Sequence, residues 1–380
     1  MHNRLFKKLG IETSCFGMGC MRLPLLESRK AEDIDEPEAI KMIRYAIDNG
    51  VTYIDTAYPY HNGKSEVLVG KALQDGYRER TKLATKSPAW LIKTYDDFEK
   101  YLDEQLERLQ TNHVDFYLLH AMSQERWEKM KELNAIGFLE EMKKKGKIKY
   151  AGFSFHDNYD TFKEIVDYHD WDMCQIQLNF YDQEYQAGLK GLKYANSKGI
   201  PVVIMEPLRG GSLATAPSAD ILELWDSAQT KRNPVEWAFS WLYNFEEVNV
   251  ILSGVSTMEQ LEENIKIFNR AQAGVLSQSE LELVEQVRNL YMDKIKIKCT
   301  GCDYCNGCPQ KVSISMIFDL YNKTHMYQNK EKYANQYKDF LMNSQHDATQ
   351  CVECGLCESL CPQNIPIIQE LKRVHAYFTQ

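Results

Sequence analysis

The stretch TYIDTA, residues 52–57, decides the fold of this 380-residue chain, because it is one of eight short runs of β-forming residues. Each run is close to a continuous stretch of β-forming residues, which is typical of strands in a parallel sheet covered on both faces. The eight runs are CFGMG (15–19), TYIDTA (52–57), KLATKS (82–87), DFYLLH (115–120), YAGFSF (150–155), CQIQLN (174–179), PVVIMEP (201–207) and VNVILSGV (248–255).

Amphipathic stretches with helical periodicity lie between these runs, for example residues 37–50, 96–110 and 191–199. The first and the last of the three end in Asn-Gly and Lys-Gly, as helices do when a glycine terminates them. Strand and helix alternate eight times, which predicts an α/β fold with parallel strands. With this number of strands we expect a closed TIM (β/α)8 barrel over residues 1–290.

The composition is that of a globular protein, with 44% hydrophobic and 26% charged residues. The formal net charge of −9 argues against a general nucleic-acid surface, because phosphate binding requires a basic face. The N-terminal residues do not read as a signal peptide, and no run approaches the roughly 18 apolar residues of a membrane helix. We therefore expect a cytoplasmic protein with no membrane or nucleic-acid partner, whose ligands are small molecules and other proteins.

Eight of the eleven cysteines fall into two blocks near the C-terminus. The first block is CTGCDYCNGCPQ, residues 299–310, and the second is CVECGLCESLCPQ, residues 351–363. A proline follows the fourth cysteine of each block. The cysteines are Cys299, Cys302, Cys305 and Cys308 in the first block, and Cys351, Cys354, Cys357 and Cys361 in the second.

Disulfides, zinc and iron–sulfur clusters are the three possible uses of such blocks. Disulfides do not suit a reducing cytoplasm, and bridges between cysteines three positions apart are strained. Zinc ribbons use two Cys-x-x-Cys pairs with a longer spacer, so zinc is an alternative that fits the spacing less well. Residues 351–362 match the bacterial ferredoxin run Cys-x2-Cys-x2-Cys-x3-Cys-Pro at every position, whereas the first block is one residue shorter before its fourth cysteine. The spacing favours two [4Fe–4S] clusters.

In the bacterial pattern the fourth cysteine of each run ligates the other cluster. We therefore expect one cluster on Cys299, Cys302, Cys305 and Cys361, and the other on Cys351, Cys354, Cys357 and Cys308. Two stretches between the blocks, residues 312–324 and 331–343, have helical periodicity. Residues 291–380 thus resemble a small, mainly helical ferredoxin-type domain, which in other proteins carries electrons.

Ionisable residues close three of the predicted strands. Asp55 ends the run TYID, Lys86 ends KLATK, and His120 ends DFYLLH. Because the carboxyl ends of barrel strands meet at one rim, where barrel enzymes place their chemistry, these side chains are candidates for an active site. Any one of them alone is as well explained by a buried ion pair or a core histidine.

The stretch YIDTAYPYHNGKSEVLVGKAL, residues 53–73, resembles the aldo/keto reductase signature, and the resemblance covers the whole barrel. It implies a catalytic tetrad of Asp55, Tyr60, Lys86 and His120. Reduction of a carbonyl by hydride leaves negative charge on its oxygen, so a proton donor must lie within hydrogen-bond reach. Tyr60 takes this part by resemblance, with Lys86 lowering its pKa, Asp55 holding the ammonium and His120 donating a second hydrogen bond.

The same resemblance implies a nicotinamide cofactor, NADP or NAD. Ser154 and Gln175 match the pair that holds the carboxamide, and Met205 occupies the place of an aromatic residue that often stacks under the nicotinamide ring. Gly19 and Cys20, which follow each other at the end of the first strand, border the cofactor.

The residues expected around the 2′-phosphate of NADPH agree only in part. Glu263 and Asn264 match, but Gly254, Val255 and Gln260 stand where lysine, serine and arginine are often found. Without those side chains a phosphate loses its charge-assisted hydrogen bonds. Three alternatives follow: Arg209 supplies the charge, NADH is the cofactor, or the nicotinamide site is vestigial and electrons arrive through the clusters.

The leading hypothesis is an iron–sulfur oxidoreductase that interconverts a small-molecule carbonyl and an alcohol, with clusters that pass electrons to or from a ferredoxin or flavoprotein. Hydride transfer moves two electrons together, whereas a [4Fe–4S] cluster moves one, and no flavin motif is evident. Two other hypotheses stay open. In one, the clusters are structural or sensory and the barrel is an ordinary reductase; in the other, the barrel is a scaffold and the chain is an electron-transfer subunit of a larger complex.

Overall fold

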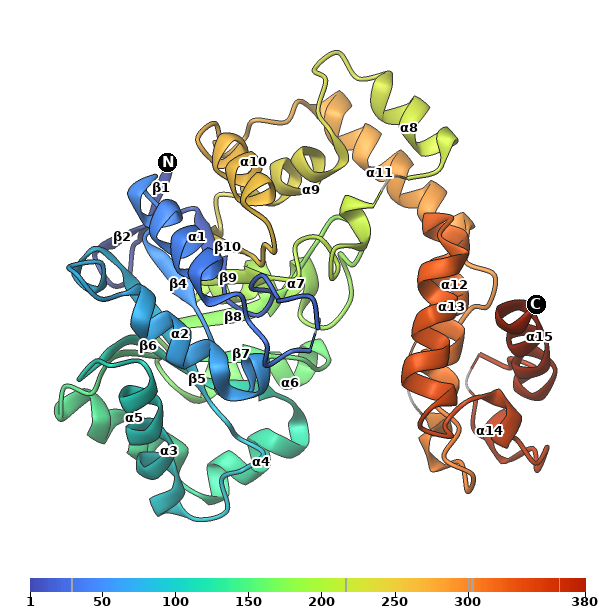
Figure 1. The fold of residues 1–380 in the computed structure, drawn as a ribbon, viewed down its shortest axis with the longest axis horizontal. Coiled ribbons are helices and arrows are strands. Elements are labelled where there is room, and N and C mark those ends of the chain that lie inside the picture. The colour runs from blue at the N-terminus through green and yellow to red at the C-terminus, as the bar shows by residue number, and fades with distance from the viewer. Residues whose placement is uncertain (29, 216, 300, 302–303, 362) are drawn as a thin grey trace. The chain divides into compact units, whose positions relative to one another are not determined.

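The computed structural model describes residues 1–380 except 29, 216, 300, 302–303 and 362. It divides into two compact units. Unit 1 comprises residues 1–210 and 235–278, and unit 2 comprises residues 211–234 and 279–380. Figure 1 shows the elements of both units along the chain.

Eight parallel strands close into a barrel in unit 1, with the order β10-β3-β4-β5-β6-β7-β8-β9. The strands coincide with the eight runs predicted from the sequence, so the predicted barrel is confirmed. They are β3 (Phe16–Gly19), β4 (Tyr53–Asp55), β5 (Lys82–Ser87), β6 (Val114–Met122), β7 (Ile148–Phe155), β8 (Met173–Gln177), β9 (Val202–Met205) and β10 (Val248–Ser253).

Helices surround the strands, as Figure 1 shows. They are α1 (Glu36–Asp48), α2 (Lys64–Ala72), α3 (Tyr95–Arg108), α4 (Gln124–Glu132), α5 (Ala135–Lys144), α6 (Tyr159–Tyr168), α7 (Gly188–Ser197), α9 (Pro234–Tyr243) and α10 (Met258–Phe268). Helix α1 shows why these stretches are helical: the Asp35 side chain accepts a hydrogen bond from the backbone N–H of Glu38, and Gly50 follows the helix at φ 90°. Aspartate at the N-cap and a left-handed glycine past the end are favourable at those positions.

An N-terminal hairpin, which the sequence analysis did not anticipate, precedes the barrel. Strands β1 (Asn3–Phe6) and β2 (Ile11–Ser14) pair in antiparallel fashion. Phe6 is fully buried and packs with residues of the barrel interior, among them Tyr53 and Phe116. The hairpin therefore contributes to the core.

Unit 2 is mainly helical. Its helices are α8 (Ala219–Asp226), α11 (Gln278–Asp293), α12 (Ile314–Tyr327), α13 (Lys330–Gln336), α14 (Leu356–Leu360) and α15 (Ile367–Thr379), and a π-helical turn (Tyr337–Met342) continues α13. Helices α12 and α13 confirm the two helices expected between the cysteine blocks.

The division into units differs from the boundary at residue 290 that the sequence suggests. Helix α11 belongs to unit 2 together with residues 211–234, and two ion pairs join these segments. Arg232 pairs with Glu280 at 2.5 Å, and Lys294 pairs with Asp220 at 2.7 Å.

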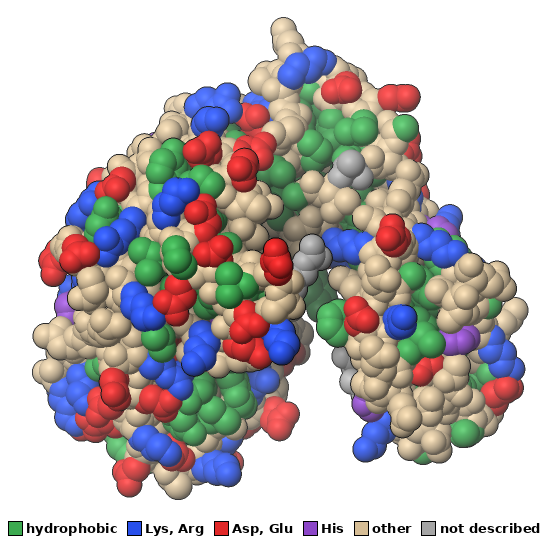
Figure 2. All heavy atoms as spheres, in the orientation of Figure 1, with side chains coloured by type: hydrophobic (Ala, Val, Ile, Leu, Met, Phe, Trp, Pro, Cys, Tyr) green, Lys and Arg blue, Asp and Glu red, His purple; other side chains and the backbone are tan. Residues whose placement is uncertain are grey.

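Charged side chains of both signs are interspersed on the face of the molecule in Figure 2, with apolar side chains between them. Among the described helices, none combines the length and the apolar character that crossing a lipid bilayer requires.

Candidate active site and cysteine centre

The three ionisable residues at strand ends lie on adjacent strands of the barrel. In the register of the sheet Asp55 of β4 is next to Gly19 of β3 on one side and next to Ala84 of β5 on the other. Lys86 follows Ala84 by two residues, and its neighbour on β6 is Leu118. The parallel register thus brings the carboxyl ends of β4, β5 and β6 to the same rim.

Asp55 and Lys86 form a buried ion pair. The Lys86 Nζ lies 2.6 Å from Asp55 Oδ1 and donates a second hydrogen bond, of 2.8 Å, to the carbonyl oxygen of Thr56. Both residues are at most 2% exposed. Burial opposes the charge of Lys86, but Asp55 and Tyr60 together outweigh it, so the pKa of Lys86 is raised. Burial also raises the pKa of Asp55, despite the nearby ammonium.

Tyr60 begins a short 3-10 turn (Tyr60–Gly63) directly after β4, and the Lys86 Nζ lies 5.0 Å from the centre of its ring. The resemblance to aldo/keto reductases implies that Lys86 lowers the pKa of Tyr60 below the usual value for a tyrosine. Instead, burial raises the pKa of Tyr60, and the Lys86 ammonium only offsets part of this increase. The reason is that the free energy lost when the phenolate is removed from water exceeds the electrostatic stabilisation that the single Lys86 cation provides.

His120 lies in a β-bulge at the end of β6, where the register with β7 shifts between Leu119 and Met122. The next residue, Ala121, has a φ of 55°, and its backbone N–H donates to Ser154 Oγ at 2.7 Å. The His120 ring centre is 6.1 Å from that of Tyr60. Burial first, and then the positive charge of Lys86, holds the pKa of His120 well below its ordinary value, so the imidazole is neutral.

His61 is a site residue that sequence reasoning missed. It is buried and follows Tyr60 with a φ of 52°. Its Nε2 accepts a hydrogen bond from the backbone N–H of Leu23 at 3.1 Å, and its Nδ1 lies 2.7 Å from the carbonyl oxygen of Ala31. His61 thus ties the Tyr60 turn to the loop that follows β3, a long-range contact with no signal in the local sequence.

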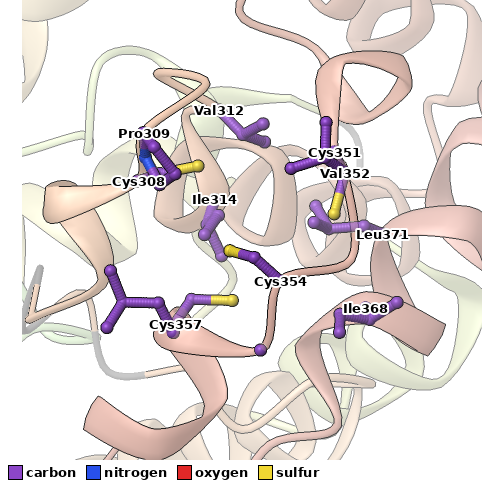
Figure 3. A pocket seen from close by; sticks show the side chains of 12 residues that line it. Cys308, Pro309, Val312, Ile314, Cys351, Val352, Cys354, Cys357, Ile368 and Leu371 are labelled. Carbon is purple, nitrogen blue, oxygen red and sulfur yellow. The ribbon is translucent and has the colours of Figure 1, made fainter.

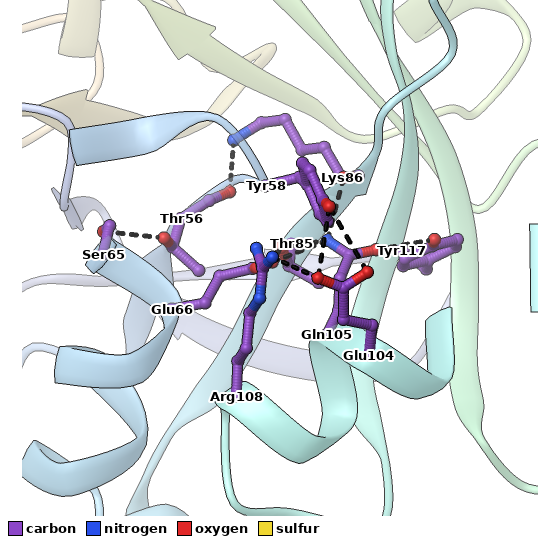
Figure 4. A network of polar contacts seen from close by, with 10 residues as sticks. All are labelled: Thr56, Tyr58, Ser65, Glu66, Thr85, Lys86, Glu104, Gln105, Arg108 and Tyr117. Atoms are coloured by element: carbon purple, nitrogen blue, oxygen red, sulfur yellow. Dashed lines mark hydrogen bonds and ion pairs between the residues drawn. The ribbon is translucent and has the colours of Figure 1, made fainter. Parts of the chain in front are cut away.

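A second polar network, shown in Figure 4, lies behind Lys86 and was also missed. The fully buried Glu66 of α2 accepts hydrogen bonds of 2.6 Å from Thr85 Oγ1 and from Gln105 Nε2. Gln105 of α3 also donates to the carbonyl oxygen of Lys86 at 3.0 Å and accepts from the Tyr117 hydroxyl at 2.8 Å. The network fixes the backbone of β5 at the residue that carries the ammonium.

Ser154 and Gln175, predicted to hold a carboxamide, are neighbours in the register of β7 and β8. Both are at most 2% exposed, and Gln175 Oε1 is buried with no hydrogen-bond partner among the described residues. Ser154 Oγ accepts from Ala121, which leaves its own proton to donate. The pair therefore presents an acceptor and a donor side by side, which fits an amide group. Met205 of β9 lies beside them, with its Sδ 3.5 Å from Gln175 Nε2.

The other predicted cofactor residues lie on the loops after β3 and β10. A Cβ added to Gly19 would be 3.6 Å from the Gly254 nitrogen, so these two glycines adjoin. Gln260 Oε1 accepts a hydrogen bond from the Ser256 N–H, and Asn264 Nδ2 donates to Ser253 Oγ at 3.1 Å. Ser253 ends β10, and Ser256 lies on the loop that follows it. Gln260, the half-buried Glu263 and Asn264 belong to α10.

Arg209 and Cys20 have partners of their own. Arg209 Nε pairs with Asp182 Oδ2 at 3.0 Å, and its guanidinium lies 4.5 Å from the centre of the Tyr181 ring. Cys20 is fully buried; burial, followed by the nearby Asp55 carboxylate, raises the pKa of its thiol, which keeps it protonated. A buried, protonated thiol is unreactive.

Four cysteines of the two blocks line one pocket in unit 2, which Figure 3 shows. Cys308 comes from the first block, and Cys351, Cys354 and Cys357 come from the second. Gly355 follows Cys354 with a φ of 77°, a left-handed conformation that lets the loop turn before α14. The rest of the wall is apolar: Pro309, Val312, Ile314, Val352, Leu356, Ile368 and Leu371.

This pocket fits an iron–sulfur cube. No group of three or more His, Cys, Asp or Glu side chains in the described part of the chain is set to hold a single metal ion. The four thiols instead surround a space with an apolar wall, and thiolate donors in such a setting are what a [4Fe–4S] cluster requires. They are the four that cross-ligation assigns to one cluster.

The structure describes only part of the second predicted set of cluster ligands, Cys299, Cys302, Cys305 and Cys361. Cys302 lies outside the described residues, and Cys299, Cys305 and Cys361 are partly exposed. The turn Tyr304–Gly307 packs against α14, which ends just before Cys361. This contact brings the first cysteine block next to the second.

A closed barrel with a lysine, an aspartate and a tyrosine at one rim defines an oxidoreductase-type site on a TIM barrel. The family comparison agrees. The model of the aldo/keto reductase family matches residues 16–289, and that of a 4Fe-4S dicluster domain matches residues 298–365. The chain belongs to the aldo/keto reductase family, and it is an oxidoreductase with an iron–sulfur domain at its C-terminus.

Similar proteins include probable aldo-keto reductase 1 from Glycine max, 26% identical over 290 residues that cover 67% of this chain and 81% of that protein. The aldo-keto reductase YhdN from Bacillus subtilis (strain 168) is 32% identical over 54% of this chain and 61% of its own length.

Two solved structures support the fold. Aldo-keto reductase AKR11C1 from Bacillus halodurans in its holo form superposes with a TM-score of 0.63 at 24% identity, covering 76% of this chain and 96% of that chain. An aldo-keto reductase from Klebsiella pneumoniae in complex with NADPH has a TM-score of 0.59 at 22% identity, with the same coverage.

Proposed function

We propose that residues 1–290 interconvert a carbonyl and an alcohol by hydride transfer, with Tyr60 as the general acid and base. The observation that carries this proposal is the Lys86 ammonium, which bonds to buried Asp55 at 2.6 Å and lies 5.0 Å from the Tyr60 ring. A buried cation that stays charged stabilises the phenolate of a neighbouring tyrosine. The tyrosine hydroxyl can therefore both release and regain a proton.

During reduction the carbonyl oxygen gains negative charge, and Tyr60 donates its proton to that oxygen. The phenolate that remains is stabilised by Lys86, and Asp55 balances the ammonium while Tyr60 is neutral. Since burial raises the pKa of Tyr60, the phenol is fully protonated at neutral pH and ready for the reductive direction. The oxidative direction uses the same atoms in reverse.

His120 contributes as a neutral hydrogen-bond donor. Its lowered pKa keeps the ring uncharged, so one ring N–H can donate to the substrate oxygen without adding a second cation beside Lys86. The bulge at Ala121, held by Ser154, orients the ring.

A nicotinamide dinucleotide is the proposed hydride carrier; when bound, it supplies the hydride to the carbonyl carbon. Gln175 Oε1 and the Ser154 hydroxyl would bind the carboxamide. Gln175 Oε1 is a buried acceptor without a hydrogen-bond partner among the described residues, and the Ser154 hydroxyl still has a proton to donate. Met205 would lie against the ring.

Residues 291–380 are proposed to hold two [4Fe–4S] clusters, one on Cys308, Cys351, Cys354 and Cys357, and one on Cys299, Cys302, Cys305 and Cys361. Such clusters supply one-electron transfer. The proposed partner is a cytoplasmic one-electron carrier of the ferredoxin or flavoprotein class. A reducing cytoplasm would keep the thiols available for iron.

The test of the barrel chemistry is Tyr60→Phe. The variant should lose carbonyl turnover by about 100-fold or more, because general acid catalysis contributes on that order. Nucleotide affinity should stay within about twofold, since the substitution keeps the aromatic ring and removes only the hydroxyl. Retained turnover would remove Tyr60 as the acid.

The test of the clusters is iron content after anaerobic purification, which should be about eight iron atoms per chain. If the purified protein contained zinc instead of iron, the cluster proposal would be wrong, and the protein would be a reductase with a structural metal.

A further inference from the structure

The loops after β9 and β10 face the loop after β3 and present two glycines to it. The cations that the resemblance led us to expect here are absent: Gln260 is engaged with the Ser256 N–H, and Arg209 is neutralised by Asp182. A dinucleotide bound across these loops would bring a dianionic diphosphate, which requires compensation.

Arg22, on the loop after β3, lies across these glycines. Its Cβ, Cγ and Cδ atoms are 3.3 to 3.5 Å from the position that a Cβ on Gly254 would take. Its Nη2 is 3.5 Å from the position that a Cβ on Gly210 would take. The guanidinium therefore reaches from the β10 loop to the β9 loop, and the bare glycine backbones leave room for it.

Hydrogen bonds fix the backbone of Arg22 on both sides. Ser256 Oγ donates to the Arg22 carbonyl oxygen at 2.9 Å, and the next N–H, that of Leu23, donates to His61 Nε2 at 3.1 Å. His61 follows the proposed catalytic Tyr60, so the same residue holds the active-site turn and the base of the arginine. These bonds hold the backbone from which the exposed Arg22 side chain extends past the two glycines.

Within the described residues Arg22 has no carboxylate partner, although most arginines of the barrel unit do. An arginine held by its backbone, stretched over two glycine loops and left without a counter-ion is suited to an anion. We propose that Arg22 supplies the cation for the diphosphate of the nicotinamide dinucleotide. This inference rests on the proposed function, because it assumes the nicotinamide site at Ser154 and Gln175.

The diphosphate is favoured over the adenosine 2′-phosphate for two reasons. Arg22 spans the β9 and β10 loops, whereas the residues expected around the 2′-phosphate lie on the β10 loop and α10 and include none on the β9 loop. There, exposed Glu259 lies in the first turn of α10, and backbone hydrogen bonds at the helix start lower the pKa of its carboxyl, so the position already carries a negative charge.

The experiment measures binding of NADH and of NADPH to the intact, anaerobically purified chain by quenching of protein fluorescence. Arg22→Gln should weaken both nucleotides about 10-fold or more and by the same factor, the usual effect of losing a hydrogen bond to a charged group. Arg22→Lys should recover part of the affinity. Arg80→Gln, which removes an exposed surface arginine paired with Asp48, is the matched control and should bind as the wild type does.

A second variant, Gly254→Val, keeps the charge but displaces the arginine stem, and it should weaken both nucleotides as well. Loss of NADPH binding alone in Arg22→Gln would overturn the diphosphate assignment in favour of the 2′-phosphate. Unchanged binding of both in Arg22→Gln would overturn the inference outright. Wild-type protein that binds neither nucleotide but reduces a carbonyl with a one-electron donor such as reduced methyl viologen would refute the inference together with the nicotinamide site, and leave Tyr60 as the proton donor.

Discussion

Lys86 is the residue on which the proposed chemistry depends, because its ammonium favours ionisation of Tyr60. Burial raises the pKa of Tyr60, the Asp55 carboxylate raises it further, and Lys86 acts in the opposite direction. The balance leaves Tyr60 protonated over the neutral range. Reduction, which begins with the phenol, and oxidation, which begins with the phenolate, should therefore respond differently to pH.

Lys86→Met tests this balance through the pH dependence of alcohol oxidation. Below the pKa of Tyr60 the phenolate fraction rises about tenfold per pH unit, and oxidation should rise with it. Removing the ammonium raises the pKa, so the oxidation profile of the variant should move to higher pH. Reduction should stay flat from about pH 6 to about pH 9 in both proteins, because the phenol is protonated there.

The matched control is Lys71→Met, which removes an exposed lysine paired with Glu36 and should leave the profile in place. Since Lys86→Met also leaves the Asp55 carboxylate buried without its partner, the variant should lose roughly 3–5 kcal/mol of stability. Adding Asp55→Asn should restore part of it. An oxidation profile that does not move in a folded Lys86→Met protein would show that Lys86 does not tune Tyr60.

The residues that the sequence identified and those it missed differ in the range of their contacts. Asp55, Lys86 and His120 could be found because each ends an apolar run, and strand ends of a barrel meet at one rim. His61, Gln105 and Arg22 could not be found, because their roles depend on contacts between different loops, helices and strands of the chain.

At the scale of elements, the packing of α2 and α3 against β5 holds Lys86 in place. Gln105 donates to Glu66 and to the carbonyl oxygen of Lys86, so one side chain links both helices to β5. The approach is close: a Cβ on Gly70 of α2 would lie 2.6 Å from the carbonyl oxygen of Arg108 at the end of α3. Only glycine fits there without a shift of the helices.

Gln105→Leu tests this arrangement. It leaves the Glu66 carboxylate and the Lys86 carbonyl each short of a donor in a buried site, which should cost about 3 kcal/mol in the free energy of unfolding. Since Lys86 is then less firmly held, kcat should fall several-fold while KM changes little. The matched control is Gln74→Leu, at an exposed position just after α2, which should alter stability by less than about 0.5 kcal/mol.

Denaturant unfolding and steady-state kinetics measure the two effects. A loss of stability with kcat intact would reduce Gln105 to a purely structural residue. If Gln105→Leu left the free energy of unfolding unchanged, the hydrogen bonds of Gln105 would not stabilise the protein as predicted.

The elements of the barrel were predictable because each strand is a local run of apolar residues, and all eight appear in the structure. The N-terminal hairpin was not, because β1 alternates exposed and buried residues over only four positions and Leu5 is exposed. The grouping of α11 with residues 211–234 could not be predicted either, since it depends on contacts between segments that are far apart in the chain, among them two ion pairs.

At the scale of the whole molecule, the proposed function joins a two-electron site in the barrel to two one-electron clusters in the C-terminal domain. Reduction of one carbonyl consumes two electrons and two protons, and two clusters that each deliver one electron match that requirement in number. The hydride route, in contrast, needs only residues of the barrel. The two routes can therefore be separated by removing a cluster ligand.

Cys357→Ser should lower the iron content by about four atoms per chain, because Cys357 is a buried member of the thiol pocket. Carbonyl reduction driven by NADH should persist, since Tyr60 and Lys86 are in unit 1, as are Ser154 and Gln175, which are proposed to bind the carboxamide. Reduction driven by a one-electron donor such as reduced methyl viologen should be lost. Cys174→Ala, which removes a buried cysteine of the barrel that lies in neither block, is the control and should retain both the iron and both activities.

The outcomes discriminate the roles of the clusters. If the viologen-driven reaction survives in Cys357→Ser with half the iron gone, the assigned pocket does not pass electrons and its cluster is structural. If the wild type shows no viologen-driven reaction at all but full NADH-driven turnover, both clusters are structural or sensory and the barrel works alone. If NADH-driven turnover disappears in Cys357→Ser while thermal unfolding of the barrel is unchanged, hydride transfer in unit 1 depends on the electrons of unit 2, and the proposal that the barrel residues suffice is wrong.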